Sequence, residues 1–114
     1  MKTALFVFNG DPMCFIHVLL NALDLQARGH EAIIVMEGAS VALPPALVKP
    51  DHPLARLFAQ VREKGLLVGA CKACSVKLGV AAEVEAAGVP LIGDMSGHPS
   101  MGSYMEAGWQ VVTF

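Results

Sequence analysis

The chain has 114 residues, the length of one domain, and a net charge of −2 without a basic block, which argues against a nucleic-acid-binding surface. Hydrophobic residues make up 54% of the sequence and charged residues 16%, where roughly 25% is usual for charged residues, and this balance excludes intrinsic disorder. Because so much apolar surface has to be covered, we expect strands buried on both faces and an interface between identical copies of the chain.

The sequence indicates neither a membrane span nor a secretory leader. The longest uncharged run, residues 12–23, is interrupted by His17 and Asn21 and is shorter than the roughly 20 apolar residues that a spanning helix needs. Lys2 is followed by an apolar run of only five residues, 4–8, which is too short for a signal-peptide core. We therefore expect a cytoplasmic protein whose three cysteines are buried thiols, metal ligands or reactive groups.

Five short apolar runs alternate with segments of helical character. The runs are rich in Val, Ile, Leu and Phe and mostly do not alternate with polar residues, which is typical of parallel strands covered on both faces. We expect strands at residues 4–8, 32–36, 66–70, 89–92 and 110–114, and helices at residues 12–28, 53–64, 75–87 and 100–107. This order predicts one α/β domain over residues 1–114, a three-layer α/β/α sandwich with right-handed crossovers.

One stretch, residues 38–53, interrupts this alternation. Its four prolines, Pro44, Pro45, Pro50 and Pro53, exclude a continuous helix. We expect a long connection with a helical turn around Val41. It either closes over a functional site or covers a neighbouring subunit.

The most informative residues follow the third predicted strand. Cys71 comes directly after the run 66–70, and a helix is expected to start at or just after it. The free N–H groups and the positive end of that helix favour thiolate over thiol, and Lys72 adds positive charge nearby. The sequence therefore predicts a reactive Cys71 with a lowered pKa.

Cys74 lies about one helical turn after Cys71, so the two thiols are expected on the same face. They could form a disulfide, or Cys74 could attack a sulfur atom carried on Cys71; two buried small apolar side chains are the alternative. Cys14 and His17 would complete four zinc ligands on paper, but they lie in an apolar helix start without zinc-ribbon spacing. We therefore expect no metal site.

Other polar residues follow the remaining strands, at the edge of a parallel sheet where ligands bind. His98 could hold the thiolate as an ion pair or donate a proton, or it could be an exposed turn residue. Glu37 and Asp94 could form an acid–base pair or only cap their loops. Asn9 and Gly10 are further candidate binding residues, but their loop lacks the glycine-rich phosphate motifs, and we expect no cofactor.

Residues 71–80, Cys-Lys-Ala-Cys-Ser-Val-Lys-Leu-Gly-Val, resemble the DsrE/DsrF-like sulfur-relay family. That family has a cysteine after its third strand and a glycine eight residues later, often as C-x-x-C-x-x-x-R-G; Leu78 stands here in place of the arginine. The segments 29–31, 88–90 and 108–114 also resemble the family. The resemblance covers essentially the whole chain.

The resemblance implies a five-stranded, mainly parallel sheet of the flavodoxin-like class and assembly as a dimer, trimer or hexamer. It also implies that Cys71 takes sulfane sulfur as a persulfide and passes it to a partner protein, with Cys74 as the second cysteine. The expected function is thus a cytoplasmic sulfur carrier, or sulfurtransferase, with donor and acceptor proteins as partners. Two alternatives stay open: a non-catalytic oligomeric module that binds a small ligand, and a thiol–disulfide redox protein.

Overall fold

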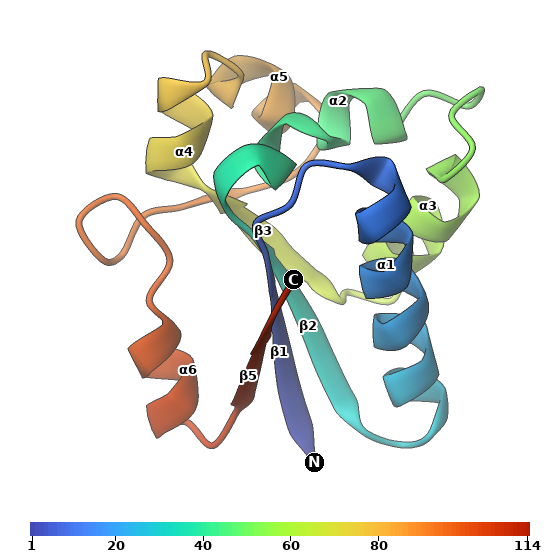
Figure 1. Ribbon diagram of the computed structural model, residues 1–114, viewed down its shortest axis with the longest axis vertical. Coiled ribbons are helices and arrows are strands. Elements are labelled where there is room, and N and C mark those ends of the chain that lie inside the picture. The colour runs from blue at the N-terminus through green and yellow to red at the C-terminus, as the bar shows by residue number, and fades with distance from the viewer.

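The computed structural model describes residues 1–114, and a five-stranded, wholly parallel sheet forms its centre (Figure 1). The strands are β1 (Lys2–Val7), β2 (Glu31–Met36), β3 (Leu67–Cys71), β4 (Leu91–Ile92) and β5 (Gln110–Thr113). They lie in the order β4-β3-β2-β1-β5, and all four pairings are parallel. The sheet confirms the predicted α/β class.

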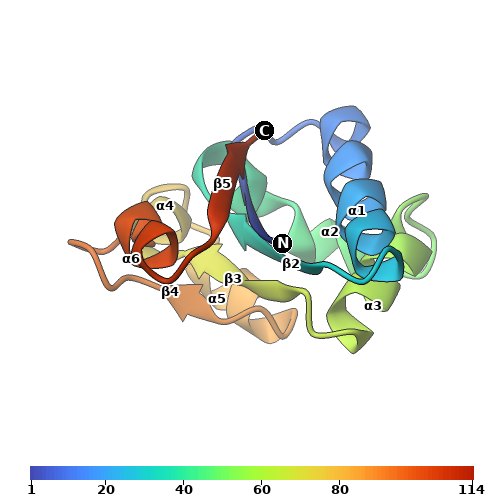
Figure 2. The same cartoon turned by 90° about the horizontal axis from the view of Figure 1, so that it is seen from below.

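Helices cover both faces of the sheet (Figure 2). They are α1 (Pro12–Ala27), α2 (Pro44–Leu47), α3 (Ala55–Glu63), α4 (Lys72–Lys77), α5 (Ala81–Ala86) and α6 (Met101–Glu106), with a 3₁₀ helix η1 (Gly38–Ala42). Helices α1 and α3 pack on one face, and α6 lies on the other. This arrangement is the three-layer sandwich that the sequence predicts.

The side chains of β1 alternate between the two layers, as they must in a strand. Leu5 and Val7 belong to a cluster of 20 buried residues on the side of α1 and α3, where the rings of Phe15 and Phe58 lie 6.4 Å apart. Phe6 faces α6, and its ring meets that of Tyr104 edge-on at 5.7 Å. The α6 side has only three fully buried residues, so most of the core lies under α1 and α3.

Two expectations about the fold are wrong. The predicted helix 75–87 is divided into α4 and α5, because Gly79 adopts the left-handed conformation at φ +72° and ends α4. The strand order also differs from the flavodoxin order 2-1-3-4-5. The chain instead adds β2, β3 and β4 outward on one side of β1 and then crosses back to place β5 on the other side.

The connection between β2 and α3 contains η1 and α2, and η1 includes the expected helical turn around Val41. Pro44 and Pro45 occupy the first turn of α2, where proline is tolerated. No helix of the structure has the length and apolar character needed to cross a membrane. Because the sheet is parallel, the carboxyl ends of all strands meet at one edge, uppermost in Figure 1.

Candidate functional site

Cys71 ends β3 and caps α4 at this edge of the sheet. Its side chain is fully buried, and its Sγ accepts a hydrogen bond from the backbone N–H of Cys74 at 3.3 Å. The buried hydroxyl of Ser75 donates to the Cys71 carbonyl oxygen at 2.7 Å and fixes the turn from strand to helix. The expected start of a helix directly after Cys71 is therefore confirmed.

Cys74 lies one turn later, on the same side of α4. Its half-buried Sγ accepts a hydrogen bond from the backbone N–H of Gly38 at 3.3 Å. Gly38 has φ +55°, and a Cβ at this position would lie 3.2 Å from the carbonyl oxygen of Phe8. A glycine is therefore needed where η1 approaches Cys74 and β1 this closely.

A tight turn after β4 brings the imidazole of His98 to both sulfur atoms. Its Nδ1 lies 3.2 Å from Cys71 Sγ and 3.9 Å from Cys74 Sγ. Two backbone hydrogen bonds between Met95 and His98, at 2.8 and 2.9 Å, close the turn. The Ala73 N–H donates to the Gly97 carbonyl oxygen at 2.8 Å and attaches the turn to α4. The structure thus joins Cys71, Cys74 and His98 into one cluster, with their ligand atoms within 4.8 Å of one another.

Glu37 lies beside this cluster, at the end of β2, and only 6% of its surface is exposed. Its backbone hydrogen-bonds with Val7 and Ser40, and its carboxylate makes no hydrogen bond in the protein but keeps contact with solvent at the cavity beside His98. Burial raises the pKa of this carboxyl group, and the nearby charge of His98 partly opposes the rise. Glu37 and His98 share a cavity of about 370 Å³ with five other residues: Phe8, Met95, Pro99, Met101 and Gly102.

The predicted lowering of the Cys71 pKa is wrong. Burial, the side-chain hydrogen bond with Cys74 and the charges of Cys74 and Glu37 raise the pKa of the Cys71 thiol from 9.0 to about 11. The backbone N–H of Cys74 is the only contribution that lowers it. A single donor at the start of the short helix α4 does not compensate for the loss of solvent around a fully buried sulfur.

The other predicted site residues lie apart from this cluster. Lys72 and Asp94 are exposed, and Asp94 acts on Tyr104, whose pKa is raised mainly by burial and further by this charge. Asn9 accepts a hydrogen bond from the N–H of Asp11 at 2.8 Å. It lines a separate cavity of about 470 Å³ with Cys14, His17, Asn21 and Phe114. Gly10 packs closely against the backbone of Ala39.

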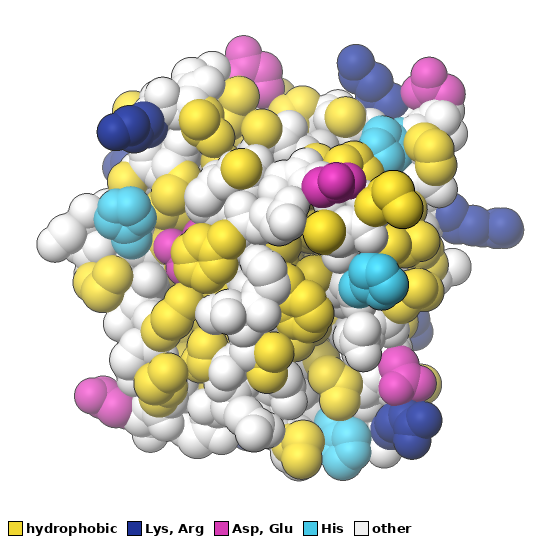
Figure 3. Space-filling view, viewed as in Figure 1, with side chains coloured by type: hydrophobic (Ala, Val, Ile, Leu, Met, Phe, Trp, Pro, Cys, Tyr) yellow, Lys and Arg dark blue, Asp and Glu magenta, His cyan; other side chains and the backbone are white.

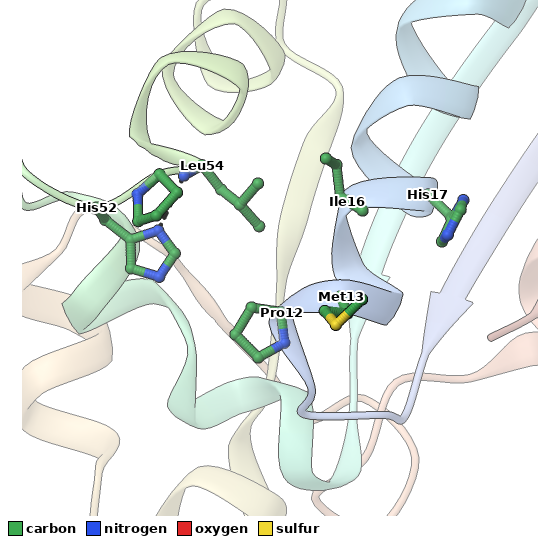
Figure 4. Close-up of a pocket in the computed structure, with 7 residues that line it drawn as sticks. Pro12, Met13, Ile16, His17, His52 and Leu54 are labelled. Carbon is green, nitrogen blue, oxygen red and sulfur yellow. Dashed lines mark hydrogen bonds between the residues drawn. The ribbon is translucent and has the colours of Figure 1, made fainter.

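A further cavity of about 480 Å³ lies between the start of α1 and the segment before α3 (Figure 4). Its walls are mainly apolar, with Met13, Ile16 and Leu54 on its surface and His17 and His52 as its imidazoles. It holds neither a thiol nor an acidic group. The chemistry is therefore concentrated at the cluster of Cys71, Cys74 and His98.

Sequence reasoning missed the residues that hold this cluster together. Gly38, Ser75 and Gly97 act through backbone or buried hydrogen bonds between segments far apart in the chain. The serine and the glycines carried no spacing signal that would indicate these contacts. The signals that point toward the site are the C-x-x-C spacing of Cys71 and Cys74 and the positions of Glu37 and His98 just after strands.

No family model matches the chain. It is 28% identical over 118 residues to an uncharacterized protein of Methanocaldococcus jannaschii, covering 98% of this chain and 94% of that protein. It is 42% identical over 43 residues to an uncharacterized protein of Archaeoglobus fulgidus, covering 38% of this chain and 70% of that protein. The fold matches a conserved protein of unknown function from Bacteroides thetaiotaomicron with a TM-score of 0.67 at 21% identity, over 99% and 95% of the two chains. This likeness concerns the fold alone.

Proposed function

We propose that the protein is a cytoplasmic sulfur carrier that takes sulfane sulfur as a persulfide on Cys71 and passes it to a partner protein. The observation that carries this role is the contact of Cys71 Sγ with a base, His98 Nδ1, at 3.2 Å and with the N–H of Cys74 at 3.3 Å. A buried thiol with a raised pKa needs such a base to become a nucleophile. The resemblance of residues 71–80 to the DsrE/DsrF-like family supports the same role.

Loading transfers one sulfur atom without net oxidation or reduction. His98 accepts the Cys71 proton, and the thiolate attacks the outer sulfur of a donor persulfide, R–S–SH. A new S–S bond forms on Cys71, the donor S–S bond breaks, and the donor leaves as a thiolate. Cys71 then carries –S–SH, and an acceptor thiolate takes the outer sulfur by the same exchange.

Cys74 gives a second route for release. Its Sγ lies within 4.8 Å of Cys71 Sγ, and its thiolate can attack the inner sulfur of the persulfide. That attack forms a Cys71–Cys74 disulfide and expels HS⁻. The same closeness of the two sulfurs favours a second candidate function, thiol–disulfide exchange, in which the two cysteines act as a redox pair without carried sulfur.

We infer that the carrier works as a homo-oligomer. Large hydrophobic side chains, including Phe8, Met95 and Met105, are exposed by 39%, 50% and 56%. Hydrophobic side chains spread over the middle of the face seen in Figure 3, while most charged side chains lie toward its rim. Such a surface is typical of an interface. Phe8 and Met95 also line the cavity beside His98, so an interface there would border the site.

Intact-mass measurement tests the carrier role. Reduced protein is incubated with polysulfide, or with thiosulfate and a sulfurtransferase, and then treated with dithiothreitol. We expect a gain of one sulfur atom that dithiothreitol reverses and that Cys71→Ser abolishes. Cys14→Ser, the same substitution at a cysteine outside the cluster, should load like the wild type.

Equal loading of Cys71→Ser and the wild type would contradict the carrier role. If the wild type gains no sulfur and instead loses two hydrogen atoms, and both Cys71→Ser and Cys74→Ser prevent this loss, the redox pair is the correct function.

A further inference from the structure

We propose that Cys71, Cys74 and His98 bind a thiophilic metal ion of the Zn²⁺ type and leave one of its coordination positions free. Two thiolates and one imidazole are ligands that Zn²⁺ prefers. The sequence offers a full zinc ligand set only if Cys14 and His17 are added, and on that ground we expect no metal site from the sequence alone. The structure supplies a different third ligand from the turn after β4.

The two distances from His98 Nδ1 to the sulfur atoms are already close to those of a zinc site, and the two sulfur atoms lie within 4.8 Å of each other. Zn–S bonds of about 2.3 Å and Zn–N bonds of about 2.0–2.1 Å in a tetrahedron place neighbouring ligand atoms roughly 3.5–3.8 Å apart. His98 Nδ1 lies 3.2 Å from Cys71 Sγ and 3.9 Å from Cys74 Sγ. Shifts of a few tenths of an ångström in the side chains would therefore bring these pairs to the required distances.

The surrounding backbone holds the ligands where an ion would need them. The N–H of Gly38 donates to Cys74 Sγ, and the N–H of Cys74 donates to Cys71 Sγ. The Met95–His98 turn is attached to α4 through Ala73 and Gly97. Each ligand thus comes from a segment fixed by its own hydrogen bonds, which reduces the entropy that binding has to remove.

Glu37 places a carboxyl group beside the cluster, close enough for its charge to act on Cys71. Only 6% of the residue is exposed, and its carboxylate makes no hydrogen bond in the protein but keeps contact with solvent in the cavity that it shares with His98. A cation in the neighbouring cluster would favour the charged form of this carboxyl group. Glu37 is not itself among the three ligands, so we assign it a role in positioning and charge balance.

Metal binding and sulfur loading would exclude each other. The ion replaces the two thiol protons, so that Zn²⁺ and two thiols give a zinc dithiolate and two released protons, with no change of oxidation state. A Cys71 thiolate bound to the ion is no longer free to attack a persulfide. The metal site requires the Cys74 thiolate as a ligand, whereas sulfur loading requires Cys71 and its base His98, so Cys74→Ser separates the two properties.

Titration of the reduced protein with Co²⁺, followed by Zn²⁺, tests the site. We expect one Co²⁺ per chain, with thiolate-to-cobalt charge-transfer bands and the intense visible bands of tetrahedral cobalt, all lost when Zn²⁺ displaces it. Cys74→Ser and His98→Asn should weaken binding by more than about 100-fold, because each removes a ligand, and Glu37→Gln by about 10–100-fold. The matched controls Cys14→Ser and His17→Asn should bind like the wild type.

Circular dichroism checks that each variant is folded. Cys71 is not substituted in this experiment, because replacing a fully buried residue can prevent folding. A wild type that binds no stoichiometric Co²⁺ or Zn²⁺ would overturn the metal site. Binding of undiminished strength in Cys74→Ser and His98→Asn would overturn it as well. Sulfur loading measured in the same samples keeps the two proposals apart, because a protein that gains sulfur on Cys71 without binding metal refutes the metal site alone.

Discussion

At the start of α4, the Cys71 sulfur has one backbone donor and otherwise lies in the protein interior. Its pKa is raised from 9.0 to about 11, so the folded protein holds the thiol proton up to a higher pH than the unfolded chain does. Stability is therefore unaffected by this group below pH 9.0, and falls as the pH rises from 9.0 to about 11. The same shift governs the reactivity of the thiol.

We predict that alkylation of Cys71 in metal-free protein is slow at neutral pH and accelerates until the pH reaches about 11. The measurement is the rate of iodoacetamide labelling of the peptide that contains Cys71, with Cys14 in the same molecule as an internal reference. A rate that levels off below pH 9.0 would show that the pKa of Cys71 is not raised, and would contradict this prediction.

Ser75 is buried and gives its only side-chain hydrogen bond to the Cys71 carbonyl oxygen. We predict that Ser75→Ala lowers the free energy of unfolding by about 1–3 kcal/mol, because it leaves a buried carbonyl oxygen without this donor. Urea unfolding measures the loss. Ser103→Ala removes a similar but exposed bond to Ser100 and should change stability by less than about 0.5 kcal/mol; equal losses would contradict the role of burial.

At the scale of elements, two glycines with positive φ have different surroundings. A Cβ on Gly38 would lie 3.2 Å from the Phe8 carbonyl oxygen, whereas a Cβ on Gly79 would meet no atom within 4 Å. Gly79→Ala should cost about 1–2 kcal/mol, the cost of the left-handed conformation alone. We predict a larger loss for Gly38→Ala, measured by urea unfolding, because β1 and η1 must also move apart. A smaller loss for Gly38→Ala would contradict the close approach.

Gly38→Ala also tests the link between η1 and the Cys74 thiol. The N–H of Gly38 donates to Cys74 Sγ, so a displaced η1 removes a donor from that sulfur. Gly79 lies at the other end of α4 and serves as the control, since its conformation does not involve either sulfur.

Most element boundaries could be read from the sequence, because the Val- and Ile-rich runs and the terminating glycines are local signals. All five strands, and the helices α1, α3 and α6, lie within two residues of their predicted bounds. The break between α4 and α5 could not be read, because Gly79 in a helical pattern is compatible with both a continuous and an interrupted helix. In the structure α5 packs against α2, α4 and β4, and these tertiary contacts have no local sequence signal.

For the whole molecule, the parallel sheet explains why part of the site was predictable. Glu37, Cys71 and His98 follow three different strands, and parallel strands bring these positions to one edge. The same rule places Asn9 and Asp94 at that edge, but it does not show that they lie outside the cluster of Cys71, Cys74 and His98. Burial of Cys71, which reverses the predicted direction of its pKa, depends on the turn around His98 and on η1, and neither contact has a local sequence signal.

Locating the added sulfur in the chain shows whether Cys71 is the residue that carries sulfane sulfur. Wild-type protein loaded with polysulfide is alkylated, digested and sequenced by tandem mass spectrometry. We predict an alkylated persulfide on Cys71, with Cys74 and Cys14 alkylated as ordinary thiols. Added sulfur on Cys74 or Cys14, with Cys71 recovered as an ordinary thiol, would contradict it.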